Sequence, residues 1–320
     1  MPRIGKLEVS RQGLGGMSLS SIYGHSDDAE SIATIHRAID LGITFFDTAT
    51  GYGAGHNEEL LGRAIRENRS SLVIASKFTH SRNGGGRVDA REAVEASLKR
   101  LGVDHIDLYY LHRIDPEVPV EESIGQLSRL ADDGKIGAVG ISEANADELR
   151  RAHATYPIAA LQSEYSLWTR EIEDEILPAA RELGIGFVGY SPLGRGFLAG
   201  VSAPEEGDRR SIHPRFQQAA VEANAQRRRV VEDIASRIGA TPAQVSLAWV
   251  LSKNLVPIPG TRRIAHLESN WAANTITLDD ATIAELEAAF PRGGTSGARY
   301  PVEQMKLVPE AKTPEAKAYA

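Results

Sequence analysis

Eight short apolar runs, separated by amphipathic segments, restrict the fold of this chain more than any other feature of its sequence. Most of the runs are apolar through most of their length, which is typical of strands buried on both faces. The first run is rich in glycine and the last carries two prolines, so these two predict less regular strands. The runs occupy residues 13–19, 43–48, 72–78, 106–112, 136–142, 158–164, 185–191 and 255–260.

The segments between the runs carry helix-end signals. Residues 88–102 begin beside Asp89, a suitable N-cap, and end at Gly102. Parallel strands need helical crossovers, and eight strand–helix units predict an α/β fold, the (β/α)8 TIM barrel. A doubly wound sheet is the alternative, but no GxGxxG motif follows the first run. The other helical patterns used here cover residues 27–42, 119–135 and 171–184.

No shift of composition marks a linker, so residues 1–320 are predicted to form a single barrel domain. Residues 1–12 alternate apolar and polar side chains around a turn and predict an N-terminal β-hairpin at the bottom of the barrel. Residues 192–222 predict a long loop after the seventh strand, where cofactor and substrate would be bound. Residues 291–320 lack a clear period and predict a tail that wraps the surface or overhangs a pocket.

Composition excludes several function classes. The 320 residues include 42% hydrophobic side chains, enough for a large core, and no cysteine, which rules out disulfides and thiolate metal sites. The net charge of -7 provides no basic field for nucleic acid. No apolar stretch reaches the ~18 residues of a membrane span, and the N-terminus has no secretory signal. We therefore expect a cytoplasmic protein, monomeric or weakly homo-oligomeric, that acts on a small molecule.

Ionisable side chains end three consecutive runs. Asp47 ends the second run, with Tyr52 in the loop beyond it, Lys77 lies near the end of the third, and His112 ends the fourth. Active sites of such barrels lie at the carboxyl ends of the strands, so these groups are expected to meet. Asp47 and Lys77 should pair, because an unpaired buried charge is costly. Each of the four alone would fit a capping, packing or surface role, whereas together they indicate a site.

These four side chains suit general acid catalysis at a carbonyl group. A phenol has a pKa of about 10, and a nearby ammonium favours the phenolate. We therefore expect Lys77 to lower the pKa of Tyr52, while Asp47 holds the lysine charged and in place. Tyr52 would protonate the carbonyl oxygen as hydride arrives at the carbon, and His112 would orient that oxygen.

Longer motifs make the pattern specific. The stretches FFDTATGYG, ASKF, YYLHRIDP, GISEAN, LQSEYSLW, GYSPLGRGFLAG and PIPGTRR occur in this order between residues 14 and 274, and as a set they resemble the aldo-keto reductase family. The resemblance implies a catalytic tetrad of Asp47, Tyr52, Lys77 and His112, and hydride transfer to a carbonyl substrate from a nicotinamide cofactor held without a Rossmann fold. YLHRIDP and GRGFLAG are more similar to the branch with pyridoxal reductases and plant alkaloid aldehyde reductases than to the aldose reductase branch.

The resemblance also implies where the cofactor lies. Tyr190 would stack on the nicotinamide ring, while Ser142 and Gln162 would hydrogen-bond its carboxamide. Glu143 stands where the wider family usually has asparagine, and its carboxylate could accept from the carboxamide NH₂. NADPH is expected rather than NADH, because a 2′-phosphate suits Thr261 and Arg262 near a helix N-terminus. The remaining cofactor contacts expected are Ser191, Leu193, Gly194, Arg195 and Gly196 around the pyrophosphate, and Gly260, His266 and Asn270.

Other functions are compatible with parts of the pattern. A metal-dependent hydrolase on the same fold is a rival, but no HxH or HExxH spacing occurs and Lys77 would repel a cation, so no metal is expected. A serine hydrolase would need a GxSxG motif, which is absent. A non-catalytic NADP(H)-sensing subunit is the alternative on the same fold. An aromatic pocket would suit aldehydes, quinones, pyridoxal or cyclic ketones, and its candidate residues are Tyr23, Phe78, Trp168 and Phe197.

Overall fold

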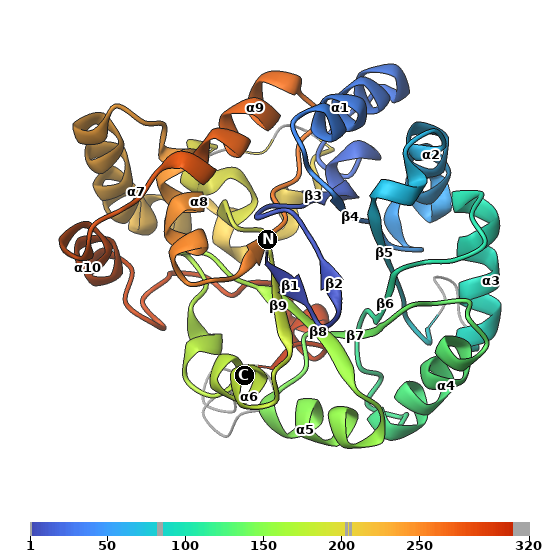
Figure 1. Cartoon of the computed structure of the whole chain (residues 1–320). Helices are drawn as coiled ribbons and strands as arrows, with labels where there is room; N and C mark the ends of the chain where they lie inside the picture. Colours follow the sequence, from blue (N-terminus) through green and yellow to red (C-terminus); the bar gives the residue numbers. More distant parts are fainter. Residues whose placement is uncertain (1, 82–85, 202–203, 205–206, 310–320) are drawn as a thin grey trace.

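Eight parallel strands form a barrel surrounded by helices, which confirms the predicted (β/α)8 fold (Figure 1). The computed structural model describes residues 2–81, 86–201, 204 and 207–309. Neighbouring strands are hydrogen-bonded in the order β10-β9-β8-β7-β6-β5-β4-β3. The strands are β3 (Leu14–Gly15), β4 (Phe45–Asp47), β5 (Val73–Phe78), β6 (Leu108–Leu111), β7 (Val139–Ser142), β8 (Ile158–Glu164), β9 (Gly186–Tyr190) and β10 (Val256–Pro257).

The first and last strands close the barrel through a narrow seam. The Gly13 amide donates to the Pro257 carbonyl at 3.0 Å, and the Gly15 amide donates to the Pro259 carbonyl at 3.4 Å. A Cβ atom on Gly15 would lie 2.6 Å from the Ile258 carbonyl oxygen, so a side chain there would push the seam apart. The glycines and prolines that weaken these two runs in the sequence therefore belong to the closure of the barrel.

Three of the four predicted helices lie where their end signals place them, whereas in residues 171–184 the α-helix begins only at Ile176, after a 3₁₀ turn at Glu171–Glu173. The Asp89 side chain accepts from the Arg91 amide before α3, and Gly102 ends that helix with φ of 65°. Helix α7 begins at Gln218, so it takes up the last residues of the 192–222 segment that was expected to be loop. The helices are α1 (Asp28–Asp40), α2 (His56–Ile65), α3 (Ala90–Leu101), α4 (Val120–Asp132), α5 (Ala146–Thr155), α6 (Ile176–Glu182), α7 (Gln218–Ile238), α8 (Pro242–Ser252), α9 (Ile264–Ala272), α10 (Asp280–Ala289) and α11 (Val302–Met305).

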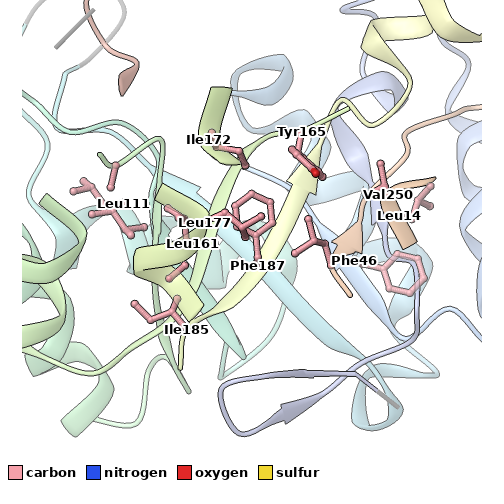
Figure 2. Close-up of a cluster of buried hydrophobic side chains, with 14 of the residues drawn as sticks. Leu14, Phe46, Leu111, Leu161, Tyr165, Ile172, Leu177, Ile185, Phe187 and Val250 are labelled. Carbon is pink, nitrogen blue, oxygen red and sulfur yellow. The ribbon is translucent and has the colours of Figure 1, made fainter. Parts of the chain in front are cut away.

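Alternate residues of the strands serve two separate cores. Side chains that point outward pack under the helices, and Figure 2 shows part of this layer, in which Leu14, Phe46, Leu161, Phe187 and Val250 belong to one cluster of buried side chains. Side chains that point inward fill the barrel. The inner core consists of Ile4, Val9, Phe45, Ala75, Leu108, Tyr110, Ala160, Val188, Val256 and Ile258.

The N-terminal hairpin closes one end of the barrel, as predicted. Its strands are β1 (Arg3–Ile4) and β2 (Leu7–Glu8), and Ile4 and Val9 are fully buried in the inner core. The opposite end, where the parallel strands finish, is therefore the end that stays open for a site. Across the described residues, no helix combines the length and the apolar character that crossing a membrane requires.

Candidate active site

The side chains of the site form the next inward layer above the inner core. Side chains of a strand alternate between its two faces, so the residue two places after an inner-core residue also points into the barrel. This period brings polar groups from several strands to the open end. The successive pairs are Phe45 and Asp47, Ala75 and Lys77, Tyr110 and His112, and Ala160 and Gln162.

Asp47 and Lys77 form a buried ion pair at the floor of the site. Their side chains are 2% and 0% exposed, and the Lys77 ammonium donates to one Asp47 oxygen and to the Thr48 carbonyl at 2.8 Å. Gln162 Nε2 donates to the second Asp47 oxygen at 2.8 Å. Burial alone would lower the pKa of Lys77, but Asp47 and Tyr52 together outweigh burial and raise it. The lysine is therefore held as a cation.

Tyr52 lies against this cation, on a loop that turns back over the strand ends. Lys77 Nζ is 5.1 Å from the centroid of the Tyr52 ring, and Gly53 and Ala54 after it adopt left-handed φ values of 57° and 55°. Burial raises the pKa of the Tyr52 phenol above its ordinary value, while the charge and hydrogen bond of Lys77 act in the opposite direction. Lys77 therefore lowers the pKa of Tyr52 in the expected direction, but burial outweighs the ammonium and the net shift is upward.

His112 presents a neutral imidazole beside the phenol. Its ring centroid is 6.0 Å from that of Tyr52, with the rings nearly perpendicular at 83°. Burial, together with the charges of Arg113 and Lys77, lowers the pKa of His112 well below its usual range. A neutral imidazole can donate one hydrogen bond to a carbonyl oxygen and does not compete with the phenol as an acid near neutrality.

A cavity of about 780 Å³ runs from Asp47 and Tyr52 across the open end of the barrel. A second hollow of similar volume, about 780 Å³, lies at the hairpin end, near Arg3, Arg181 and Lys253, away from the tetrad. Most of the predicted site residues line the first cavity. The predicted residues that line it are Tyr23, Asp47, Tyr52, Gln162, Tyr190, Ser191, Leu193, Arg195, Gly196, Gly260, Thr261, Arg262, His266 and Asn270.

Glu143 binds protein groups rather than facing an open carboxamide position. Its two carboxylate oxygens accept from Arg299, at 2.7 Å for the shortest contact, from the Tyr190 hydroxyl at 2.8 Å and from the Glu164 amide at 2.9 Å. Burial would raise the pKa of Glu143, but the Arg299 guanidinium and these donors lower it to about 2. The structure therefore gives Glu143 a different use from the one expected, since its acceptor sites already have donors.

Arg195 is likewise committed to an ion pair. Its guanidinium donates to Glu164 at 2.8 Å and to the Arg299 carbonyl at 2.9 Å, and it lies 4.6 Å above the ring of Tyr300. Its side chain is only 4% exposed. Arg195 was expected to offer its charge to the cofactor pyrophosphate, but Glu164 already balances that charge. Arg195 and Gly196 still line the cavity.

The far end of the cavity carries cations with fewer partners. Arg262 donates to the Tyr23 carbonyl at 3.0 Å, and among the described residues no carboxylate lies within 4.0 Å of Arg262 or Arg263. Both arginines precede α9, whose first turn has no side-chain cap. Thr261 Oγ1 instead accepts from the Arg263 amide at 3.1 Å. This end suits an anion.

Besides Lys77 and His112, five predicted residues are not among those that line the cavity. Phe78, Trp168 and Phe197 are at most 2% exposed, and Trp168 stacks on Phe197 with ring centroids 4.1 Å apart. Their aromatic area is used in packing, which corrects their assignment to the substrate pocket. Gly194 packs on Trp168, and the Ser142 hydroxyl accepts from Arg113 at 3.2 Å.

Several residues at the mouth of the barrel were not expected. Arg299 and Tyr300 belong to the C-terminal segment, Glu164 is the last residue of β8, and Arg113 follows β6. The motif YLHRIDP contains Arg113 and LQSEYSLW contains Glu164, so a signal existed for these two. Nothing local marks the tail arginine. Within the described residues, no group of three His, Asp or Glu side chains is arranged to hold a metal.

Comparison with known proteins agrees with this geometry. A model of the Aldo/keto reductase family matches residues 12–290. The chain belongs to the aldo/keto reductase family. As a member, it is an oxidoreductase.

Individual relatives extend over nearly the whole chain. Probable aldo-keto reductase 1 of Glycine max is 45% identical over 307 residues, which are 92% of this chain and 89% of that protein. The thermostable aldo-keto reductase Tm1743, solved with the inhibitor epalrestat, has a TM-score of 0.73 at 32% identity, over 89% of this chain and 96% of that one. An aldo-keto reductase from Klebsiella pneumoniae, solved with NADPH, has a TM-score of 0.72 at 28% identity, over 89% and 92% of the two chains.

Proposed function

We propose that this aldo/keto reductase reduces an aldehyde or ketone to an alcohol with NADPH. The observation that carries the proposal is the arrangement of Tyr52 against a buried, charged Lys77 on the wall of a cavity large enough for a cofactor and a small substrate. Bound NADPH would supply the hydride. The protein must then supply a proton to the carbonyl oxygen and hold the reacting groups in place.

Tyr52 is the proton donor in this proposal. Its burial keeps the phenol protonated, so the acid is present throughout the neutral range. Negative charge that develops on the substrate oxygen would be stabilised by the phenol and by the neutral His112 imidazole. Lys77, held by Asp47, would stabilise the phenolate that remains after proton transfer.

The cavity provides polar groups suited to a dinucleotide. Tyr190 lies beside the tetrad with its hydroxyl fixed by Glu143 and Tyr300, so its ring is a firm platform for a nicotinamide. Ser18 Oγ lies on the cavity wall, buried and without a hydrogen-bond partner in the described part of the chain. Such an atom fits a ligand that brings its own partner. Gln162 keeps its carbonyl oxygen for the carboxamide, since its amide nitrogen donates to Asp47.

A preference for NADPH over NADH follows from the far end of the cavity. Arg262 and Arg263 lie beside the uncapped start of α9, where a 2′-phosphate would meet both guanidinium charge and backbone N–H groups. The NADPH bound to the Klebsiella pneumoniae relative supports the same choice. His266 and Asn270 would flank the adenine on the same helix.

The substrate is proposed only as a class. The motifs YLHRIDP and GRGFLAG favour the branch with pyridoxal reductases and plant alkaloid aldehyde reductases. Aromatic aldehydes, pyridoxal, quinones and cyclic ketones are therefore the compounds to try. Tyr23 and Tyr52 are aromatic side chains that line the cavity.

The test is NADPH consumption by the purified protein with these carbonyl compounds, with NADH in parallel. We expect turnover with NADPH at a KM at least about tenfold below that for NADH, and a smaller difference in Arg262→Ala. Deuterium at C4 of the reduced nicotinamide should appear on the carbinol carbon of the product. Absence of turnover on every compound would contradict the proposal.

A further inference from the structure

The loop that carries Tyr52 is anchored to β5, the strand that carries Lys77. Before Tyr52, the Thr48 amide donates to the Ala75 carbonyl at 2.9 Å, and the Thr50 amide donates to the Lys77 carbonyl at 3.0 Å. These backbone bonds continue the pairing of β4 with β5 past the end of β4. The approach of the chain to Tyr52 is therefore fixed by the same strand that positions the ammonium.

The chain beyond Tyr52 has a strained backbone and needs anchors of its own. Gly53, Ala54 and Gly55 have left-handed φ values of 57°, 55° and 99°, before α2 begins at His56. This conformation is costly for alanine, because its Cβ crowds the backbone, and it persists where the surrounding structure holds it. Contacts at the start of α2 therefore decide where the turn and the phenol come to rest.

Glu58, in the first turn of α2, supplies such a contact. Its side chain is 0% exposed, and its Oε1 accepts from the Ser76 hydroxyl at 2.5 Å. Ser76 lies between Ala75 and Lys77 in β5, and its side chain is on the opposite face of the strand from theirs. The bond therefore ties the start of α2 to the residue next to Lys77.

Arg100 fixes the Glu58 carboxylate from a third element, helix α3. Its Nε and Nη2 lie 2.7 and 2.6 Å from Glu58 Oε2, while Oε1 accepts from Ser76. The stem of Arg100 also lies against the turn, since a Cβ atom on Gly55 would be 2.7 Å from its Cδ. A buried polar network whose members have their partners is rigid, so this carboxylate is a firm attachment point.

Asn57, the preceding residue, holds the same turn in other directions. Its Oδ1 accepts from the Thr48 hydroxyl at 2.7 Å, and its Nδ2 donates to the Gly16 carbonyl at 2.8 Å and to the Ser20 hydroxyl at 2.7 Å. These bonds fix the start of α2 toward the ends of β3 and β4. Glu58 supplies the corresponding bond to β5.

We infer that Glu58 is a positioning residue for the proposed acid: through its bond to Ser76 it sets the phenol of Tyr52 against the Lys77 ammonium. The inference rests on the proposed function and adds a residue that is not among those lining the cavity. The distance that it maintains is the 5.1 Å from Lys77 Nζ to the centroid of the Tyr52 ring. A displacement of about 1 Å between reacting groups can cost about 10²-fold in rate.

The test compares two variants that remove the same charge. Glu58→Gln and Glu58→Met are similar in length, and both deprive Arg100 of its anionic partner. They differ at Ser76, because an amide can bond a hydroxyl in either orientation, whereas a thioether is a weak acceptor. The rate of hydride transfer would be measured in a single turnover, with saturating NADPH and the carbonyl compound that the unaltered protein reduces best.

We expect this rate to fall about 30-fold in Glu58→Met and less than about threefold in Glu58→Gln, with the Kd for NADPH changed less than about threefold in both. Ser76→Ala should lower the rate about tenfold by itself, and in its background the two Glu58 variants should give equal rates. Ser123→Ala is the matched control. It removes another buried hydroxyl, bonded to His80 at 2.9 Å, and should keep the rate within about twofold.

Equal rates in Glu58→Gln and Glu58→Met, or an equal loss in Ser123→Ala, would overturn the inference while leaving carbonyl reduction in place. Failure of the proposed function would instead appear as no turnover by the unaltered protein with any carbonyl compound. Amide hydrogen exchange then decides the inference alone, since residues 50–55 should exchange at least about tenfold faster in Glu58→Met than in Glu58→Gln. Equal exchange in the two variants would overturn it.

Discussion

The site contains two buried ionic arrangements that differ in construction. At the floor, Asp47 and Lys77 come from the adjacent strands β4 and β5 and are 30 residues apart. At the mouth, Glu143 and Arg299 are 156 residues apart and join the end of β7 to the C-terminal segment. Both pairs are at most 3% exposed. The first is made by the regular sheet and the second by chain that lies outside it.

The two arrangements also act on different tyrosines. The floor pair places a charged ammonium against Tyr52, the proposed acid. The mouth pair holds Tyr190, whose hydroxyl bonds Glu143 and Tyr300, and so fixes the proposed platform for the nicotinamide. In the proposed function the two pairs therefore have separate roles: the Asp47–Lys77 pair acts on the acid, and the Glu143–Arg299 pair positions the cofactor.

The largest expected effect comes from removing the cation at the floor. Lys77→Met leaves the buried Asp47 carboxyl without its cation, and should cost about 3–5 kcal/mol of unfolding free energy and about 10³-fold in kcat. The double variant Asp47→Asn/Lys77→Met should regain most of the stability and none of the activity. Chemical denaturation and NADPH consumption measure the two quantities. Recovery of activity in the double variant would contradict a chemical role for the pair.

The mouth should show its ionic character in the pH dependence of stability. The folded-state pKa of Glu143 is lowered to about 2 from an ordinary value of 4.5, so its contribution is fully present above the ordinary value and is lost as pH falls toward 2. Glu143→Gln should therefore be about 3 kcal/mol less stable than the unaltered chain at pH 7. The difference should shrink between pH 4.5 and 2 in urea unfolding. A difference independent of pH would show that shape, not charge, matters there.

A smaller effect, confined to cofactor binding, is expected from the tail arginine. Arg299→Met removes the guanidinium that holds Glu143, the acceptor of the Tyr190 hydroxyl, and should raise the KM for NADPH about tenfold, with kcat changed less than threefold. Arg292→Met is the matched control. Its ion pair with Asp174 is about half exposed, so its loss should change stability by at most ~0.5 kcal/mol and leave the KM unchanged. A loss in kcat alone for Arg299→Met would contradict the proposal that the Glu143–Arg299 pair acts on cofactor binding and not on the chemical step.

The same difference explains what could be predicted from sequence. Asp47, Lys77 and Gln162 follow apolar runs at known positions, and the period of two along parallel strands is enough to bring them together. Arg299 lies in a segment without period, and its partner Glu143 is distant in sequence, so no local pattern could pair them. The net direction of the Tyr52 pKa shift could not be predicted, for another reason. The ammonium was visible in the sequence, whereas the extent of burial, which outweighs it, is a property of the packed structure.

The aromatic residues show a related limit. The sequence suggests Trp168 and Phe197 for the substrate pocket, but aromatic side chains are as common in cores as in pockets. The structure stacks them on each other, at 4.1 Å between ring centroids, and both are buried. Of the four residues proposed for the substrate pocket, Tyr23, Phe78, Trp168 and Phe197, only Tyr23 lines the cavity. Residue type could not separate these cases, because the distinction depends on which face of the loop each side chain occupies.

The most direct test of the account compares turnover and cofactor binding in Tyr52→Phe. The substitution removes one hydroxyl and keeps the ring that lies against Lys77. The account predicts that kcat for carbonyl reduction falls at least about 10²-fold, while the Kd for NADPH, measured by fluorescence titration of the same preparation, changes less than about threefold. Turnover retained in Tyr52→Phe would contradict the central claim that this phenol is the acid.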